Sequence, residues 1–223
     1  NFIKLITLAA ELDEEQVLCT YLKDSGIVIS LGHSDATYEQ TQQLLKKGYV
    51  ENATHFSNGM RGIHHREPGL QVALLQSDCT IEMIADGLHV HPAMIKFLLE
   101  AVGEDRMILI SDSIRAADLA DGIYDLGGQQ VRVEKGLCTL VGKDNLAGST
   151  LNLNSARQNV KKWLRLSDIV LAKLTATNSA KRLGLDERKG SVVPGKDADF
   201  FVVDEKDEVL LTVSEGIIIY QNK

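Results

Sequence analysis

Short apolar runs alternate with amphipathic segments along the first half of the chain. The apolar runs predict strands over Phe2–Leu8, Ile27–Leu31, Asn52–Phe56, Thr80–Ala85 and Met107–Ser111. Between them, apolar residues at helical spacing predict helices over Asp13–Lys23, Tyr38–Lys47, Gly69–Gln76 and Pro92–Val102. Strand–helix repeats of this length are typical of right-handed βαβ units in a parallel sheet, so either a barrel or a doubly wound sheet fits.

For two of these helices, the sequence also indicates the apolar side or the residues at the ends. The apolar residues of the first helix fall on one side. They are Val17, Leu18, Tyr21 and Leu22. For the second helix, Ser34 or Asp35 is the expected N-cap and Gly48 the expected stop.

The alternation changes after Asp112. Residues 121–142 alternate apolar and polar around glycine turns and predict a β-hairpin insertion. Helical patterns return over Leu151–Trp163, Ser167–Leu174 and Ser179–Leu183. From Gly190 the pattern is that of strands again, in "DADFFVVD" and "GIIIYQN". This tail is too short to fold alone, so we expect it to belong to a small β domain whose other strands lie elsewhere.

Composition narrows the class of protein. The 223 residues carry a net charge of −7 with no basic stripe, so neither a nucleic acid nor an anionic membrane is an expected partner. The cysteines are widely spaced and form no C-x-x-C pair, which predicts free thiols in a reducing compartment. With no apolar run of membrane-spanning length and no signal-peptide pattern, the expected location is cytoplasmic.

Polar residues of unusual chemistry follow four of the predicted strands. His33 and Asp112 each follow one strand, His55 ends the run Asn52–Thr54 of another, and "DGLHV" with His89 follows a fourth. In a barrel, the carboxyl ends of all strands meet on one face, where two imidazoles and a carboxylate would suit a divalent metal with a general base. A single histidine at a strand end is more often a hydrogen-bonded structural residue, but four such coincidences favour a site.

Other readings of individual residues stay open. Asp86 precedes a glycine, and this pair is common in turns. Asp112 could cap the following segment. His64 and His65 lie in a polar loop and are expected to be solvated, and His91 next to Pro92 suits a helix start.

The segment "NGMRGIHHREPG" has the elements of a phosphate site. Asn58 and Gly59 provide flexible backbone, and Arg61 and Arg66 provide guanidinium groups. A surface loop whose arginines pair with Glu67 or with solvent fits the spacing equally well.

Six motifs, in this order, resemble the N-acetylglucosamine-6-phosphate deacetylases of the amidohydrolase superfamily. They are "GHSDATYEQ", "THFSNGM", "HHREPGL", "IADGLHV", "LISDS" and "LAGSTL", and the tail "GSVVPGKDADFFVVD" is similar to the segment that closes the small β domain. The resemblance covers essentially the whole chain. It implies part of an α/β (β/α)8 TIM-like barrel over residues 1–189, with the insertion near 121–142, and the last strands of a small β-sandwich domain over 190–223.

The resemblance also implies a reaction. His33 and His55 match two metal ligands of the family, and Asp112 matches its catalytic aspartate. The expected cofactor is a divalent metal, zinc or iron, as one or two ions. The expected reaction is hydrolysis of the acetamide of N-acetylglucosamine 6-phosphate to glucosamine 6-phosphate and acetate, with Asp112 taking a proton from water and giving it to the departing amine.

Substrate contacts and assembly are implied in the same way. His89 matches a histidine that contacts the sugar, Asn58 and Gly59 match backbone amides at the phosphate, and Arg66 matches an arginine at the phosphate. A homodimer is expected, with the region around Arg66 near its interface.

The chain departs from the family in several places. Gly59 stands where alanine is usual, and Ser113 and Ile114 differ from the commoner small residues. The family's H-x-H pair and its glutamate ligand have no matching motif, and the opening "NFIKLITLAAE" lacks a methionine. We therefore expect the C-terminal portion of a longer enzyme, inactive or impaired by itself. The alternatives are another amidohydrolase acting on a cyclic amide or acylated amine, and a non-catalytic truncated paralogue.

Overall fold

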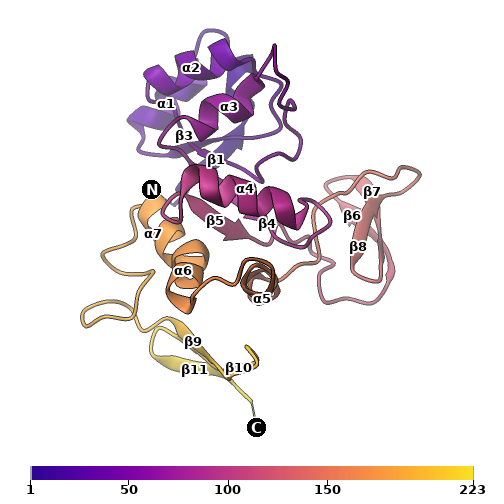
Figure 1. Cartoon of the computed structure of the whole chain (residues 1–223), viewed down its shortest axis with the longest axis vertical. Coiled ribbons are helices and arrows are strands. Elements are labelled where there is room, and N and C mark those ends of the chain that lie inside the picture. Colours follow the sequence, from indigo (N-terminus) through magenta and orange to yellow (C-terminus); the bar gives the residue numbers. More distant parts are fainter. Residues whose placement is uncertain (1, 223) are drawn as a thin grey trace.

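A parallel sheet of five strands organises the first half of the molecule (Figure 1). The computed structural model describes residues 2–222. The strands lie in the order in which they occur in the chain, β1 (Leu5–Leu8), β2 (Val28–Leu31), β3 (Val50–Ala53), β4 (Thr80–Ile84) and β5 (Met107–Ile110). Every neighbouring pair is parallel, which confirms the predicted βαβ repeats. The third strand begins earlier than predicted and ends at Ala53, so that His55 lies in the turn after it.

Four helices connect the strands and cover one face of the sheet. They are α1 (Val17–Asp24), α2 (Tyr38–Lys46), α3 (Gly69–Leu75) and α4 (Pro92–Val102). The residues of the sheet that face them are apolar and buried, namely Ile29, Leu31, Ala53, Ile81, Met83, Met107 and Leu109. They share one core with Leu22, Leu44, Leu70 and Leu98 of the helices. Burial of this face explains why the strands are aliphatic at alternate positions.

The first helix differs from its prediction. It begins at Val17, after a 3-10 helix over Ala10–Leu12, and it buries Cys19 and Leu22. Val17 and Tyr21 are each 66% exposed, so of the apolar side noted in the sequence only Leu22 is buried. Gln16 takes a left-handed conformation and the Asp13 carboxylate accepts the backbone N–H of Cys19, which together set the rotation of the helix.

The second helix is capped by a residue other than those predicted. Thr37 accepts the N–H of Gln40, and the Gln40 side chain accepts the N–H of Thr37, so the two form a capping box. Ser34 donates to the Glu11 carboxylate instead of capping the helix. Gly48, with a positive φ, ends the helix as predicted.

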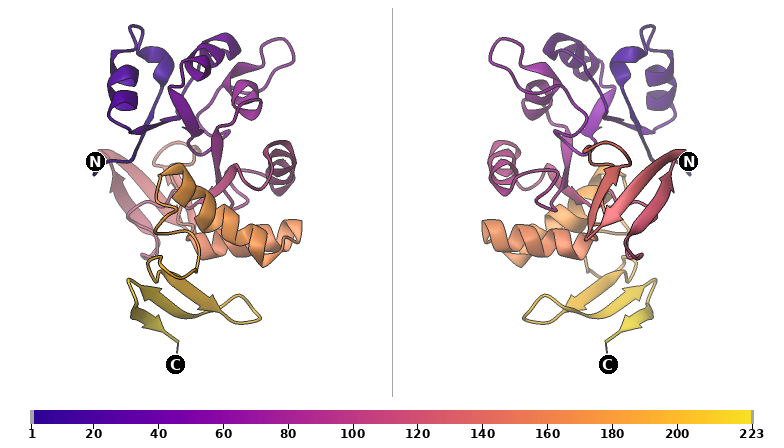
Figure 2. Two further views of the ribbon diagram at one scale, coloured as in Figure 1. Left: turned by 90° about the vertical axis from the view of Figure 1, so that its left-hand side faces the viewer. Right: turned by 90° about the vertical axis from the view of Figure 1, so that its right-hand side faces the viewer.

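The insertion after β5 forms a small antiparallel sheet with one more strand than a hairpin. Its strands are β6 (Gly122–Leu126), β7 (Gln129–Glu134) and β8 (Leu137–Leu140). Val131, Val133 and Cys138 pack with Ile114 and Ala116 in a separate core. The insertion projects from the right side of the molecule in Figure 1, and it lies in front in the right-hand view of Figure 2.

The remaining helices pack beside β5. They are α5 (Leu153–Leu164), α6 (Asp168–Ala172) and α7 (Asn178–Arg182), and a π-helical turn over Lys173–Thr177 joins the last two without a break. Two separate helices were predicted here. The buried Asn178 amide donates to the carbonyls of Glu104 and Met107, which holds the joined helix against the start of β5.

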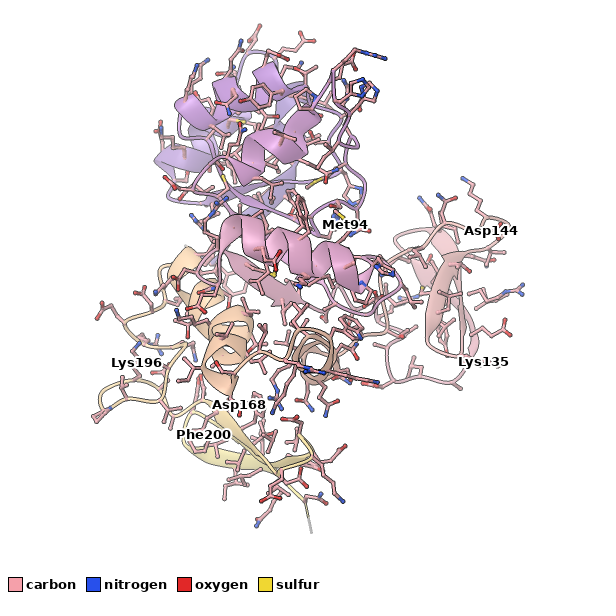
Figure 3. All side chains as sticks on the ribbon, viewed as in Figure 1. Met94, Lys135, Asp144, Asp168, Lys196 and Phe200 are labelled. Carbon is pink, nitrogen blue, oxygen red and sulfur yellow. The ribbon has the colours of Figure 1, made fainter. Side chains whose placement is uncertain are left out.

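The chain ends in a third sheet, at the bottom of Figure 1. It consists of β9 (Phe200–Val203), β10 (Val209–Ser214) and β11 (Ile217–Gln221) in the order β11-β10-β9. The sequence pattern predicted the outer two strands but not β10. In Figure 3, Phe200 of β9 lies close to Asp168 of α6, and both line a cavity of about 470 Å³ between the helix and this sheet. Among the described residues, no helix combines the length and apolarity needed to cross a membrane.

Candidate active site

Four polar residues occupy the same position relative to the parallel strands. His33, His55, Asp86 and Asp112 each lie two residues beyond the last residue of β2, β3, β4 and β5. Because the strands are parallel and adjacent, this register brings the four residues to one edge of the sheet. The φ angles of His33, His55 and Asp112 are 49°, 33° and 50°. Left-handed conformations of non-glycine residues cost energy and cluster at functional sites.

The two strand-end histidines meet. Their Nε2 atoms are 2.9 Å apart, and the rings lie edge to face with centroids 4.6 Å apart. His55 is 6% exposed, and burial is the main cause that lowers the pKa of His55, with the neighbouring His33 acting in the same direction and Asp112 against it. A neutral imidazole is the form that binds metals, so this pair has the chemistry of two metal ligands converging on one point.

The pair by itself supplies only part of a metal site. Within residues 2–222, no group of three or more His, Cys, Asp or Glu side chains is placed to hold a metal ion. The Nδ1 atom of His55 is buried without a hydrogen-bond partner among these residues. Packing and the contact with His33 therefore orient the His55 ring.

A half-buried carboxylate that the sequence analysis did not single out lies next to the histidines. Glu82 points from β4 into a cavity of about 440 Å³ that Asp112 also lines. Burial raises the pKa of the Glu82 carboxyl, the nearby charge of Asp112 adds to this, and hydrogen bonds from Asn52 and from the His55 backbone oppose it. The sequence signal that could have identified Glu82 is a charged residue within the mostly apolar strand "TIEMI".

On the face of the sheet away from the helices, hydroxyl and amide side chains form hydrogen bonds between neighbouring strands. The Asn52 amide donates to Ser30 and to Glu82, at 2.8 Å in both cases, and its oxygen accepts the Thr80 hydroxyl. Thr54 bonds to Ser30 in turn. The parallel sheet is therefore apolar toward its helices, and on its other face β2, β3 and β4 carry polar side chains that satisfy one another's hydrogen bonds.

The backbone of Asp112 is held by the end of the insertion. The Ser149 N–H donates to the Asp112 carbonyl, and the Ile114 N–H donates to the Ser149 carbonyl, both at 2.9 Å. Gly148 has a φ of 64°, and a Cβ there would lie 2.4 Å from Cγ2 of Ile114. The insertion thus begins after Asp112, and the segment "LAGST" at its end lies next to Asp112 again.

Gly59 lies against His33. A Cβ at Gly59 would stand 2.8 Å from Nδ1 of His33, and its φ is 57°. Glycine at this position therefore allows the loop to approach the imidazole closely. The neighbouring Asn58 uses its backbone N–H to bond the His55 carbonyl at 2.9 Å, so this N–H is engaged within the loop.

The two arginines of this loop differ in their surroundings. Arg61 forms a two-bond pair with Asp35, with both distances 2.8 Å, and not with Glu67. Arg66 is exposed, and no ion pair involves it within the described part of the chain. His64 and His65 are exposed, as predicted, and their rings lie 4.3 Å apart.

His89 lies in the loop after β4, where its Nδ1 is 2.6 Å from the Asp86 carboxylate. Across residues 2–222, no hydrogen bond or ring contact joins His89 to the histidine pair. His91 caps α4 by accepting the N–H of Ala93, which confirms its predicted place at a helix start.

Comparison with known proteins gives a consistent result. The sequence profile of the amidohydrolase family matches residues 19–219. A Bacillus subtilis protein named N-acetylglucosamine-6-phosphate deacetylase is 41% identical over the whole chain, which covers 56% of that protein. The crystal structure of an N-acetylglucosamine-6-phosphate deacetylase from Thermotoga maritima superimposes with a TM-score of 0.93 at 37% identity, with all of this chain and 60% of that one covered.

A third structure contains a sugar phosphate. It is a mutant N-acetyl-D-glucosamine-6-phosphate deacetylase from Mycobacterium smegmatis in complex with N-acetyl-D-glucosamine-6-phosphate. Its TM-score is 0.91 at 33% identity, and the match covers 96% of this chain and 57% of that one. The chain thus spans little more than half the length of the relatives that it matches.

Proposed function

This chain belongs to the amidohydrolase family, and from that premise we propose that it is the C-terminal part of a metal-dependent deacetylase. The proposed reaction hydrolyses the acetamide of N-acetylglucosamine 6-phosphate to glucosamine 6-phosphate and acetate. The observation that carries the proposal is the meeting of the His33 and His55 Nε2 atoms at the edge of the sheet where Asp112 also lies.

We further propose that the five-stranded sheet is part of a (β/α)8 barrel within residues 1–189, and that 190–223 belong to a small β domain. The sequential strand order and the helices on one face support the barrel. The face of the sheet away from α1–α4 carries the polar residues Asn52 and Glu82. Polar residues fit the inside of a barrel that surrounds a site, whereas in a doubly wound sheet this face would pack against a second layer of helices.

His33 and His55 fit the ligand set of a divalent metal, zinc or iron, and would hold it through Nε2. The lowered pKa of His55 keeps that ring neutral at pH 7, as a ligand must be. When bound, such a metal polarises a carbonyl and makes water more acidic. The further ligands expected for the family, an H-x-H pair and a glutamate, have no matching motif in this chain.

Asp112 is the proposed general base and acid. Its place beside the histidines lets its carboxylate take a proton from the attacking water. The same carboxyl then gives the proton to the departing sugar amine, which is necessary because an amide anion is a very poor leaving group.

The loop residues have proposed roles in binding the sugar phosphate. His89 orients the sugar, and the backbone at Gly59 with the unpaired, exposed Arg66 binds the phosphate. Asn58 is proposed at the phosphate as well, although its N–H must first leave the His55 carbonyl. A homodimer with Arg66 near the interface and a cytoplasmic location stay predictions.

The test uses the protein joined to its upstream coding segment and measures acetate release and bound metal. Asp112→Asn should lower kcat by about 10²- to 10⁴-fold with unchanged metal content. His55→Ala should lose both metal and activity. If Asp112→Asn keeps most of the activity, or if His55→Ala keeps its metal, the proposed site is wrong.

A substitution of Arg66 tests whether the substrate carries a phosphate. Arg66→Ala should raise KM for N-acetylglucosamine 6-phosphate far more than for neutral N-acetylglucosamine, because only the former needs the guanidinium. Arg132→Ala, an exposed arginine on β7, is the matched control. Equal effects on both substrates would favour another amidohydrolase acting on a neutral acylated amine or cyclic amide, and a metal-free native protein would favour a non-catalytic paralogue.

A further inference from the structure

The proposed chemistry leaves one residue at the edge of the sheet without a role. Asp86 follows β4 at the position where His33, His55 and Asp112 follow their own strands. Its side chain is 10% exposed, and that of its neighbour His89 is 7% exposed. A nearly buried carboxylate among the proposed active-site residues needs an explanation.

Both oxygens of the Asp86 carboxylate are engaged. Oδ1 accepts the backbone N–H groups of Leu88 and His89, at 2.8 and 2.9 Å. Oδ2 lies 2.6 Å from Nδ1 of His89. Burial acts to raise the pKa of Asp86, but the hydrogen bonds from His89 and the backbone outweigh it and hold this pKa below its usual range.

A turn accounts for only half of these contacts. An aspartate before glycine closes a turn by accepting backbone N–H groups, which is the role of Oδ1. The bond from Oδ2 to the imidazole adds nothing to the turn. Since an ionised carboxylate only accepts hydrogen bonds, Nδ1 of His89 must carry a proton, and the neutral ring then has its lone pair on Nε2.

The turn that carries the pair is supported from behind by α5. The Asn159 amide donates to the Ala85 carbonyl at 2.9 Å. Gly87 has a φ of 79°, and a Cβ there would lie 3.3 Å from the Trp163 ring. Helix and turn are thus packed closely enough to hold the Asp86–His89 pair in one orientation.

We propose that Asp86 is a positioning residue that fixes the ring orientation and tautomer of His89, so that Nε2 is presented to the substrate as a hydrogen-bond acceptor for a sugar hydroxyl. The inference rests on the proposed function, in which His89 contacts the sugar. Asp86 itself does not touch the substrate and acts through His89.

The decisive variant is Asp86→Asn. Asparagine keeps an oxygen for the two backbone N–H groups, but its NH2 group faces Nδ1 and donates to it. The His89 proton should then move to Nε2, which becomes a donor. In the full-length metal-loaded protein, we expect kcat/KM to fall about 10- to 100-fold with melting temperature and metal content unchanged.

Asp204→Asn is the matched control. The Asp204 carboxylate also accepts two backbone N–H groups in a turn, at 2.8 and 2.9 Å, and among residues 2–222 no imidazole bonds to it. This variant should retain wild-type activity. A second readout is the double variant with His89→Ala, in which Asp86→Asn should cause no further loss because its effect passes through the imidazole.

A spectroscopic measurement separates this inference from the proposed function. Histidine side-chain 1H–15N spectra should show His89 protonated at Nδ1 in the wild type and at Nε2 in Asp86→Asn, whether or not the protein deacetylates a sugar. An unchanged tautomer, or the same loss from Asp86→Asn with and without His89, would overturn the inference. Absence of deacetylase activity in the wild type, with the tautomer change present, would overturn only the proposed function.

Discussion

At the scale of single residues, the site depends on backbone conformations that most side chains avoid. His33, His55 and Asp112 turn the chain immediately after a strand with positive φ angles. Each unfavourable conformation persists because its surroundings hold it. At Asp112 the holding group is the Ser149 N–H, next to a glycine that no other residue could replace without overlap.

Gly148→Ala should therefore disturb Asp112. The added Cβ would lie 2.4 Å from Ile114, so we expect a loss of about 2 to 4 kcal/mol in the free energy of unfolding, from left-handed strain and overpacking together. Gly142→Ala is the control, since Gly142 also has a positive φ but meets nothing within 4 Å. Urea unfolding measures both variants, and equal losses would show that strain alone, without the overlap, explains the effect.

At the scale of elements, the C-terminal sheet is attached to α5 through one turn. Asp207, between β9 and β10, pairs with Arg157 at 2.7 Å and Lys161 at 2.9 Å. Its backbone carbonyl accepts the Gln158 amide. Arg157 is nearly buried, and its positive charge is compensated by Asp207 and by Asp168, which lies farther away at 3.7 Å.

This anchor should depend on pH. The hydrogen bond from Lys161, followed by that from Arg157, lowers the pKa of Asp207. A carboxylate with a folded-state pKa below its unfolded value of about 3.9 stabilises the fold above that value and loses the contribution as pH falls through the folded pKa. Asp207→Asn should cost about 2 kcal/mol at pH 7, and much less at pH 3.

The measurement is the free energy of unfolding at both pH values. Glu205→Gln, an exposed change in the same turn, should alter neither value. A cost for Asp207→Asn that is the same at pH 7 and pH 3 would contradict the assigned charge interaction.

At the scale of the whole molecule, exposed apolar side chains gather in two regions: one around α1, with Val17 and Tyr21, and the other on the C-terminal sheet. β11 is an edge strand, and four of its residues are about half to two-thirds exposed: Ile217, Ile218, Ile219 and Tyr220. An exposed apolar edge strand is a template for pairing with another chain. In Figure 1 this sheet lies at the end of the molecule opposite α1 and α2.

The 223-residue chain by itself should therefore self-associate at concentrations on the order of tens of micromolar. Ile219→Lys should shift it toward the monomer by placing a charge on the edge strand. Leu119→Lys makes the same change at an exposed residue of the loop before β6, outside both apolar regions, and should have little effect. Light scattering after size-exclusion chromatography measures both, and a monomeric wild type would contradict the prediction.

The sequence predicted most elements because their signals are local. Pro92–Val102 matches α4 residue for residue, since proline at its start and glycine after it mark both ends. The β10 strand and the joined helix through Lys173–Thr177 were not predicted. The joined helix depends on a partner that lies far away in the chain, the carbonyl of Met107 bonded to Asn178. The β10 strand pairs with its chain neighbours β9 and β11, so here the local pattern was missed.

The sequence by itself determined the alternation of strands and helices and which polar residues follow each strand. Those properties depend on side-chain period and on residues a few positions apart. Tertiary structure alone decided that α1 buries Cys19 rather than Val17, that Arg61 pairs with Asp35, and that Asp86 faces His89. These contacts depend on how helices rotate and loops fold against a common sheet, and one sequence pattern is compatible with several such arrangements.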